Sequence, residues 1–132
     1  MWVRQIASNS NVRIVAPTPA AQIRALTVTP DGSFVDFVRR ESNRLPALWR
    51  VPFLGGTSRK LVDEAVSAPG WSPDGKQMAF LTSTSANTET HVVVAEADGS
   101  RPRVPSRMII LRIQNPAHHA VQLAMWMGLR SA

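Results

Sequence analysis

The chain repeats itself after 43 residues, and this duplication limits the folds that it can adopt. Pro30-Asp31-Gly32 recurs 43 positions later as Pro73-Asp74-Gly75. The same offset separates Leu54-Gly55-Gly56 from Ala97-Asp98-Gly99. Two turn signals held in register across a whole unit predict an internal repeat of one supersecondary unit.

Large apolar residues recur at the same offset, which indicates that the register is kept inside the strands. The matched pairs are Val28 with Trp71, Val35 with Met78, Phe37 with Phe80, Trp49 with Val92 and Val51 with Val94. Short apolar segments between the turns predict strands at about 26–29, 33–39, 47–53 and 58–62, then at about 69–72, 76–83, 91–96 and 101–104. Four short strands at a period of roughly 40–45 residues are typical of a β-propeller blade.

Asp-Gly and Gly-Gly pairs connect neighbouring strands in these predicted blades. Gly and Asp tolerate the positive φ angles that tight hairpin turns require. The predicted structural turn residues are Asp31, Gly32, Gly55, Gly56, Asp74, Gly75, Asp98 and Gly99.

The predicted blades divide the chain into four parts. Residues 1–15 form the second half of a blade, because Trp2 to Val15 aligns with Trp49 to Val62. Residues 16–62 hold a proline-containing linker and a complete blade, and residues 63–105 hold a second complete blade. The predicted fold is therefore all-β, a partial β-propeller of about two and a half four-stranded blades with an irregular strand/helix C-terminal tail.

Residues 106–132 leave the pattern. The period places the next Pro-Asp-Gly at 116–118, but those positions hold Pro116-Ala117-His118. One strand is predicted over 107–113 and a short helix over 119–129. A shifted reading frame or a truncated gene is one hypothesis for this loss of pattern, and the flanking gene sequence decides it.

Near-continuous apolar strands such as Met78-Ala79-Phe80-Leu81 predict sheets that are covered on both faces. Closed propellers have 4–8 blades, so the outer faces of a shorter stack need further cover. We expect a fragment of a longer propeller; the alternative is a small domain that closes by oligomerising. The expected partners therefore include the missing blades of the parent or a second copy.

Composition excludes several classes of chemistry. The chain has no cysteine, which excludes disulfides and thiol catalysis, and no apolar run long enough to predict a membrane segment.

The net charge of the chain is +6, and the excess of basic residues lies in residues 1–62. Arg39, Arg40 and Arg44 form the one tight group, in a predicted exposed loop. This group is either a solvated surface or a binding loop for an anionic partner; nucleic acid is not expected, since the cations are not interleaved with stacking aromatics.

Candidate catalytic residues are few. Ser72 lies in Gly70-Trp71-Ser72-Pro73-Asp74, which matches a nucleophile elbow except at the fifth position, where Asp replaces Gly. We therefore expect Ser72 to cap a turn. His118 and His119 have no further ligand at metal spacing, so no catalytic residue, metal or cofactor is predicted. Asp36 is unusual, because its strand position is matched by Ala79; it faces a channel, faces solvent or pairs with an arginine.

The sequence Trp71-Ser72-Pro73-Asp74-Gly75-Lys76, followed by Met78-Ala79-Phe80 and Val92-Val93-Val94, resembles the WD-repeat-like blade of the TolB type. This resemblance implies a bacterial propeller that carries no catalytic residue of its own. Leu48 to Pro52 with Leu54-Gly55-Gly56-Thr57 resembles the C-terminal propeller of bacterial receptor-type serine/threonine kinases.

The kinase resemblance implies a sensor or interaction domain outside the cytoplasm or in the periplasm. Such a domain binds a protein or a small ligand through its loops, here residues 39–43 and 84–90. The alternative is a propeller that gates a prolyl-oligopeptidase-like serine hydrolase.

Overall fold

The computed structural model describes residues 1–5, 10–83 and 90–105, and this part of the chain consists of strands and their connections. The strands are β1 (Trp2–Gln5), β2 (Ser10–Arg13), β3 (Ala21–Val28), β4 (Phe34–Glu41), β5 (Ala47–Pro52), β6 (Arg59–Asp63), β7 (Gly70–Trp71), β8 (Gln77–Ser83) and β9 (Thr90–Glu96). The predicted all-β class is confirmed. The tail predicted to hold a strand and a helix lies outside the described residues.

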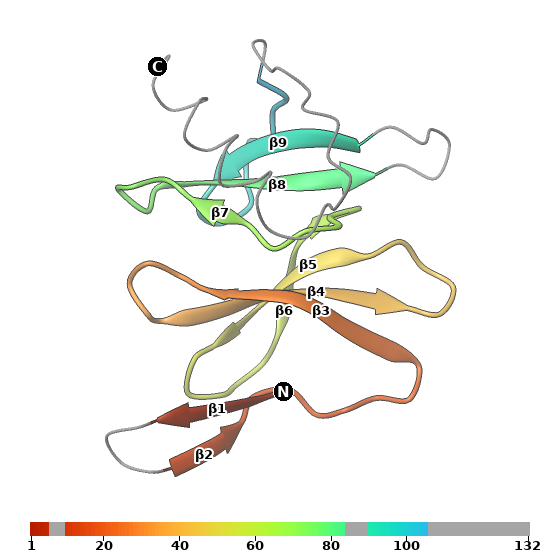
Figure 1. Cartoon of the computed structure of the whole chain (residues 1–132), viewed down its shortest axis with the longest axis vertical. Helices are drawn as coiled ribbons and strands as arrows, with labels where there is room; N and C mark the ends of the chain where they lie inside the picture. The colour runs from red at the N-terminus through yellow and green to blue at the C-terminus, as the bar shows by residue number, and fades with distance from the viewer. Residues whose placement is uncertain (6–9, 84–89, 106–132) are drawn as a thin grey trace.

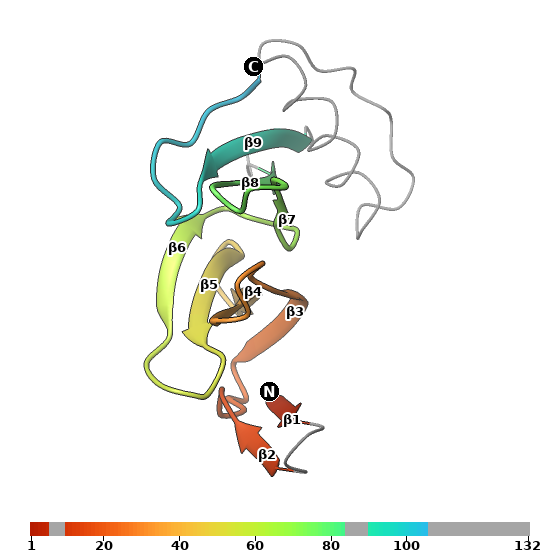
Figure 2. The same ribbon diagram turned by 90° about the vertical axis from the view of Figure 1, so that its left-hand side faces the viewer.

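Three antiparallel sheets follow one another along the chain and stack face to face (Figure 1). The first sheet contains β1 and β2, the second has the order β3-β4-β5-β6, and the third has the order β7-β8-β9. Within each sheet, every strand pairs with the next one in sequence, so successive connections lie at opposite ends of the sheet. Figure 2 shows β3 and β7, the first strands of their sheets, on the same side of the stack.

β3 is longer than the sequence predicts, since it begins at Ala21 rather than near residue 26. A β-bulge explains the difference: the register shifts between Arg24 and Leu26, and Ala25 has a φ of 47°. The bulge adds a residue on one strand and so interrupts the strict alternation that strand prediction relies on.

β7 is shorter, because the segment before it runs along β8 as an irregular strand. The Val66 N–H donates to the Leu81 carbonyl (2.8 Å), and the Leu81 N–H donates to the Ser67 hydroxyl (2.9 Å) rather than to a backbone carbonyl. Pro69 follows, and proline cannot donate to a ladder. The fourth strand predicted at 101–104 is reduced to a single bridge between Val94 and Arg103.

The register of the third strand differs from the predicted repeat by one residue. Phe37 lies opposite Trp49, whereas its counterpart Phe80 lies opposite Val93 and not Val92. The reason is a connection of residues 42–46 in one sheet against 84–89 in the other. The repeat offset is therefore 43 for the first two strands and 44 for the third.

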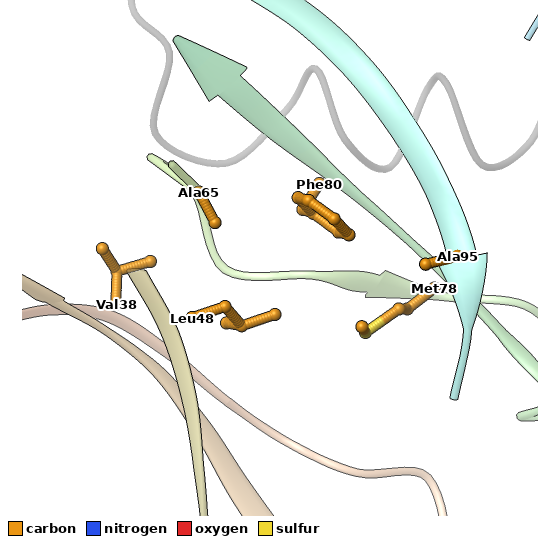
Figure 3. Packing of buried hydrophobic residues seen from close by; sticks show 6 residues of the cluster. All are labelled: Val38, Leu48, Ala65, Met78, Phe80 and Ala95. Atoms are coloured by element: carbon orange, nitrogen blue, oxygen red, sulfur yellow. The ribbon is translucent and has the colours of Figure 1, made fainter. Parts of the chain in front are cut away.

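Two apolar clusters bury the second sheet on both faces. The cluster toward β7-β8-β9 contains Val38, Leu48, Ala65, Met78, Phe80 and Ala95, whose side chains meet between the two sheets (Figure 3). The cluster toward β1-β2 contains Ile14, Val35, Phe37 and Val51. Trp49 and Trp71 are half-buried beside these clusters, whereas Trp2 is 65% exposed.

The predicted turn glycines carry the positive φ angles. The values are 75° for Gly32, 94° for Gly55, 144° for Gly56, 70° for Gly75 and 86° for Gly99. The Gly55 N–H donates to the Pro52 carbonyl and the Gly99 N–H donates to the Glu96 carbonyl (both 2.9 Å). Gly99 is therefore the counterpart of Gly55, in agreement with the offset of 44.

Gly32→Ala and Gly99→Ala separate backbone strain from crowding. Both glycines have left-handed φ angles, which cost an L-residue roughly 1–2 kcal/mol. A Cβ at Gly99 lies 3.0 Å from the Leu61 carbonyl oxygen, whereas a Cβ at Gly32 meets nothing within 4 Å. We expect Gly99→Ala to lower the free energy of unfolding by about 1 kcal/mol more than Gly32→Ala, as measured by urea denaturation. Equal losses contradict the tight contact between the 96–99 turn and β6.

Candidate functional site

In the β3-β4 and β7-β8 turns, the aspartate carboxylates stabilise the turn by accepting hydrogen bonds. Asp31 Oδ1 accepts hydrogen bonds from the Thr29 hydroxyl (2.7 Å) and the Ser33 N–H (3.0 Å). Asp74 Oδ1 accepts the same pair of bonds from the Ser72 hydroxyl (2.6 Å) and the Lys76 N–H (3.0 Å). Positive φ falls on the glycines rather than on these aspartates. The expectation that Asp supplies positive φ is therefore wrong, and its role is that of an acceptor.

Ser72 is a turn residue in this geometry. Its hydroxyl donates to Asp74 and accepts from the Gln77 N–H at 3.0 Å, and the residue is 4% exposed. Thr29 has the same position in the second sheet and accepts from the Phe34 N–H at 3.1 Å. Both bonds of the hydroxyl therefore close a hairpin.

These hydrogen bonds lower the pKa of the turn aspartates below 3.8. The largest cause is the Thr29 hydroxyl for Asp31 and the Ser72 hydroxyl for Asp74. For Asp98 it is the side chain of Ser100, whose N–H also donates to Asp98 at 2.8 Å. A carboxylate that accepts hydrogen bonds is favoured in its charged form.

Asp36 and Arg50 form a buried ion pair between neighbouring strands. They lie directly opposite each other on β4 and β5. Arg50 Nε is 2.7 Å from Asp36 Oδ1, and Arg50 Nη2 is 2.8 Å from Asp36 Oδ2. Asp36 is 0% exposed and Arg50 is 5% exposed. Of the three environments considered for Asp36, the structure has the one with an arginine partner.

Arg50 also connects two sheets. Its guanidinium carbon lies 5.4 Å from the centre of the Phe34 ring and 5.5 Å from that of Trp71 on β7. In the next sheet the cross-strand pair at the equivalent register is Ala79 and Val94. The ion pair therefore belongs to this one interface and is not needed for the strand pairing itself.

The predicted basic loop is divided between a strand and a turn. Arg39 and Arg40 lie on β4, and only Arg44 lies in the connection, so the predicted loop position of the first two is wrong. Arg39 Nη2 is 3.2 Å and Arg44 Nε is 3.7 Å from the carboxylate oxygens of Glu41. The Arg39 guanidinium also lies 5.2 Å from the centre of the Trp49 ring. Glu41 thus offsets part of the positive charge of Arg39 and Arg44.

Arg40 lies opposite Gln22, and Gln22 accepts a hydrogen bond from Arg24 at 2.9 Å. We call Arg24, Arg39, Arg40 and Arg44 the basic end group. All four lie where β3 begins and β4 ends, so four cations share this end with Glu41. Arg24 and Gln22 gave no sequence signal, because their proximity to Arg40 depends on the extension of β3 past its bulge.

Other sites are limited in the described part of the chain. Residues 1–5, 10–83 and 90–105 contain no cluster of His, Cys, Asp and Glu that suits a metal ion. Within the same ranges no helix is long and apolar enough to span a bilayer. The predicted contact loop at 84–90 and the pair His118 and His119 lie outside the described residues, except for Thr90 at the start of β9.

Comparison with solved structures shows the fold. The chain is similar to a protein from Agrobacterium tumefaciens assigned as TolB, with a TM-score of 0.63 and 18% sequence identity. The described strands therefore have a β-propeller fold similar to that of this protein. The match covers 78% of this chain and 39% of the other protein, so the chain spans less than half of that protein's length. No family model matches the sequence. No curated protein matches it either.

Protonation of the turn aspartates is expected to destabilise the fold in acid. Their folded pKa values lie below 3.8, so their stabilising effect is present at neutral pH and is lost as the pH falls through the folded pKa. We expect the combined variant Asp31→Asn, Asp74→Asn and Asp98→Asn to be less stable at pH 7 and to lose less stability than wild type between about pH 5 and pH 2. Urea midpoints report both effects. Asp63→Asn is the control outside these turns, and parallel pH profiles for wild type and triple variant contradict the interpretation.

Asp36→Ala is expected to lower the free energy of unfolding by about 3–5 kcal/mol, because it leaves the buried Arg50 charge without a partner. Adding Arg50→Val reproduces the Ala79 and Val94 pair of the next sheet and is expected to restore most of the loss. A double-mutant cycle by urea denaturation measures this coupling. Additive losses in the double variant contradict it.

Proposed function

We propose that this chain is a non-catalytic propeller segment that binds an acidic protein or ligand through the basic end group. The observation that carries the proposal is the excess of cations over carboxylates at this end. Glu41 is the carboxylate within ion-pair distance of Arg39 and Arg44, and Arg40 is exposed on the opposite face of β4. Exposed arginines suit bidentate contacts to carboxylates.

The two ends of the second sheet differ in a way that supports this location. At the opposite end, the turn carboxylates are occupied by hydroxyl and backbone donors. At the end of β4, the Arg44 side chain is 80% exposed and meets Glu41 only at 3.7 Å. Because exposed ion pairs are weak, Arg44 can exchange Glu41 for the carboxylate of a bound partner at a small cost in free energy.

We further propose that the parent protein is a bacterial receptor-type serine/threonine kinase, in which this propeller is the sensor or interaction domain. The support is the resemblance of Leu48 to Pro52 and Leu54 to Thr57 to such propellers. The flanking gene sequence tests the proposal. A kinase domain with a membrane helix upstream is the expected result, and a hydrolase domain downstream favours the gating propeller instead.

Charge reversal tests the binding end. We expect Arg40→Glu with Arg44→Glu to weaken binding of a fluorescein-labelled glutamate-rich peptide several-fold per reversed charge, since an exposed ion pair contributes up to about 1 kcal/mol. Fluorescence anisotropy at low and at physiological salt measures the affinity, which should fall with salt. Lys76→Glu makes the same type of charge change at the other end of the sheets and is the control. An equal effect of the control overturns the proposed location.

A further inference from the structure

The basic end group already holds one carboxylate, that of Glu41. Glu41 Oε1 lies 3.2 Å from Arg39 Nη2, and Glu41 Oε2 lies 3.7 Å from Arg44 Nε. The turn after β4 brings these residues together, since the Arg44 N–H donates to the Glu41 carbonyl at 3.2 Å. The two oxygens of Glu41 therefore face two different arginines, as the carboxylate of an acidic ligand would.

The guanidinium of Arg39 is only partly paired by this contact. Arg39 Nε is buried, and no described residue accepts a hydrogen bond from it. Arg50 shows a complete contact in the same sheet, because its Nε and Nη2 lie 2.7 and 2.8 Å from the two oxygens of Asp36. A buried donor without an acceptor is costly, so a carboxylate that pairs with both Nε and Nη2 of Arg39 gains more than an ordinary exposed ion pair.

The positions of the two carboxylates explain this difference. Residues two apart on a strand point to the same face and lie about 7 Å apart along it. Glu41 therefore approaches Arg39 along β4, whereas Asp36 approaches Arg50 from the strand directly opposite. A carboxylate from another molecule is free of this constraint and can approach Arg39 as Asp36 approaches Arg50.

Trp49 holds the Arg39 guanidinium in place for such a contact. Trp49 lies on β5 and packs against the cluster toward β1-β2, and the centre of its ring is 5.2 Å from the guanidinium carbon of Arg39. The Arg39 side chain is 26% exposed, against 80% for Arg44. A side chain that is ordered before binding loses less conformational entropy when the ligand binds. Arg39 is therefore the better-ordered of the two arginines that meet Glu41.

We infer that Arg39 recognises a glutamate or aspartate side chain of the partner, and that Glu41 is an internal competitor which this side chain displaces. The inference rests on the proposed function, since it concerns the same basic end group. The Glu41 side chain is 35% exposed, so it can turn into solvent when the partner's carboxylate takes its place. Glu41 thus lowers the affinity for carboxylates that cannot reach both nitrogens of Arg39.

Glu41→Gln tests the role of Glu41. We expect this variant to bind the fluorescein-labelled glutamate-rich peptide about threefold more tightly than wild type at physiological salt, as measured by fluorescence anisotropy. Asp63→Asn is the matched control. It removes one negative charge at the same end of the sheet, but Asp63 lies on β6 and pairs with Lys60 at 2.8 Å. Equal effects of the two variants overturn the inference, because they report net charge alone.

Arg39→Lys tests the role of Arg39, since lysine keeps the charge but lacks the two parallel donors. We expect the affinity to fall about threefold or more, with little further effect of Glu41→Gln in this background. Arg59→Lys, at the opposite end of β6, is the control for the exchange itself. Circular dichroism checks that the variants fold, and Glu41→Gln decides the question if Arg39→Lys unfolds.

The nitrogen resonance of Arg39 Nε reports the contact directly. The signal is assigned by its loss in Arg39→Lys, or in Arg39→Gln if the lysine variant unfolds, and it is expected to shift as the peptide binds. A bound peptide with an unmoved Arg39 signal, or with an unchanged affinity in Arg39→Lys, overturns this inference alone. A peptide that binds neither wild type nor Glu41→Gln at low salt overturns the proposed function and this inference with it.

Discussion

The structure depends on the need of each sheet to have both faces covered. β4 has four consecutive buried residues, Val35 to Val38: Val35 and Phe37 belong to the cluster on one face of its sheet, and Val38 belongs to the cluster on the other face. A strand with apolar residues on both faces cannot be stable in a sheet with one wet face, because each exposed face forfeits its hydrophobic stabilisation. Stacking is therefore a condition of folding, and the position of each neighbour decides which surface is left for binding.

One interface contains a charged pair where its counterpart is apolar. Ala79 and Val94 show that small apolar residues satisfy the same strand positions. Asp36 and Arg50 form charge-assisted bonds in that place, and Arg50 reaches Trp71 on the next sheet. Because desolvation offsets much of the Coulomb attraction, we expect the pair to contribute more to the choice of the neighbouring sheet than to net stability. A sheet without a ring at the position of Trp71 would bury the guanidinium without that contact.

The sequence predicted most of the second sheet, since its turns and apolar strands follow a repeat. The bulge at Ala25 and the Ser67 bond to Leu81 were not predictable, because both arise from pairing with strands distant in sequence. The shift from Val92 to Val93 opposite Phe80 follows from the longer connection, whose effect on register needs the structure. Pairing with an arginine was one of three alternatives for Asp36, but the sequence did not identify which arginine, because Arg50 becomes its neighbour only once the register of β4 and β5 is known.

The two ends of the sheets differ in how firmly their connections are held by hydrogen bonds. At the turn end, the Phe53 N–H donates to Ser33 and the Ala97 N–H donates to Lys76 (both 2.9 Å), so neighbouring turns within each sheet hold one another. A Cβ at Gly75 would lie 3.6 Å from Pro30, which brings the turns of adjacent sheets into contact. Changes there alter the fold. At the other end of the sheets, the Arg44 side chain is 80% exposed and meets Glu41 only at 3.7 Å, so we expect substitutions there to leave the stacked sheets intact.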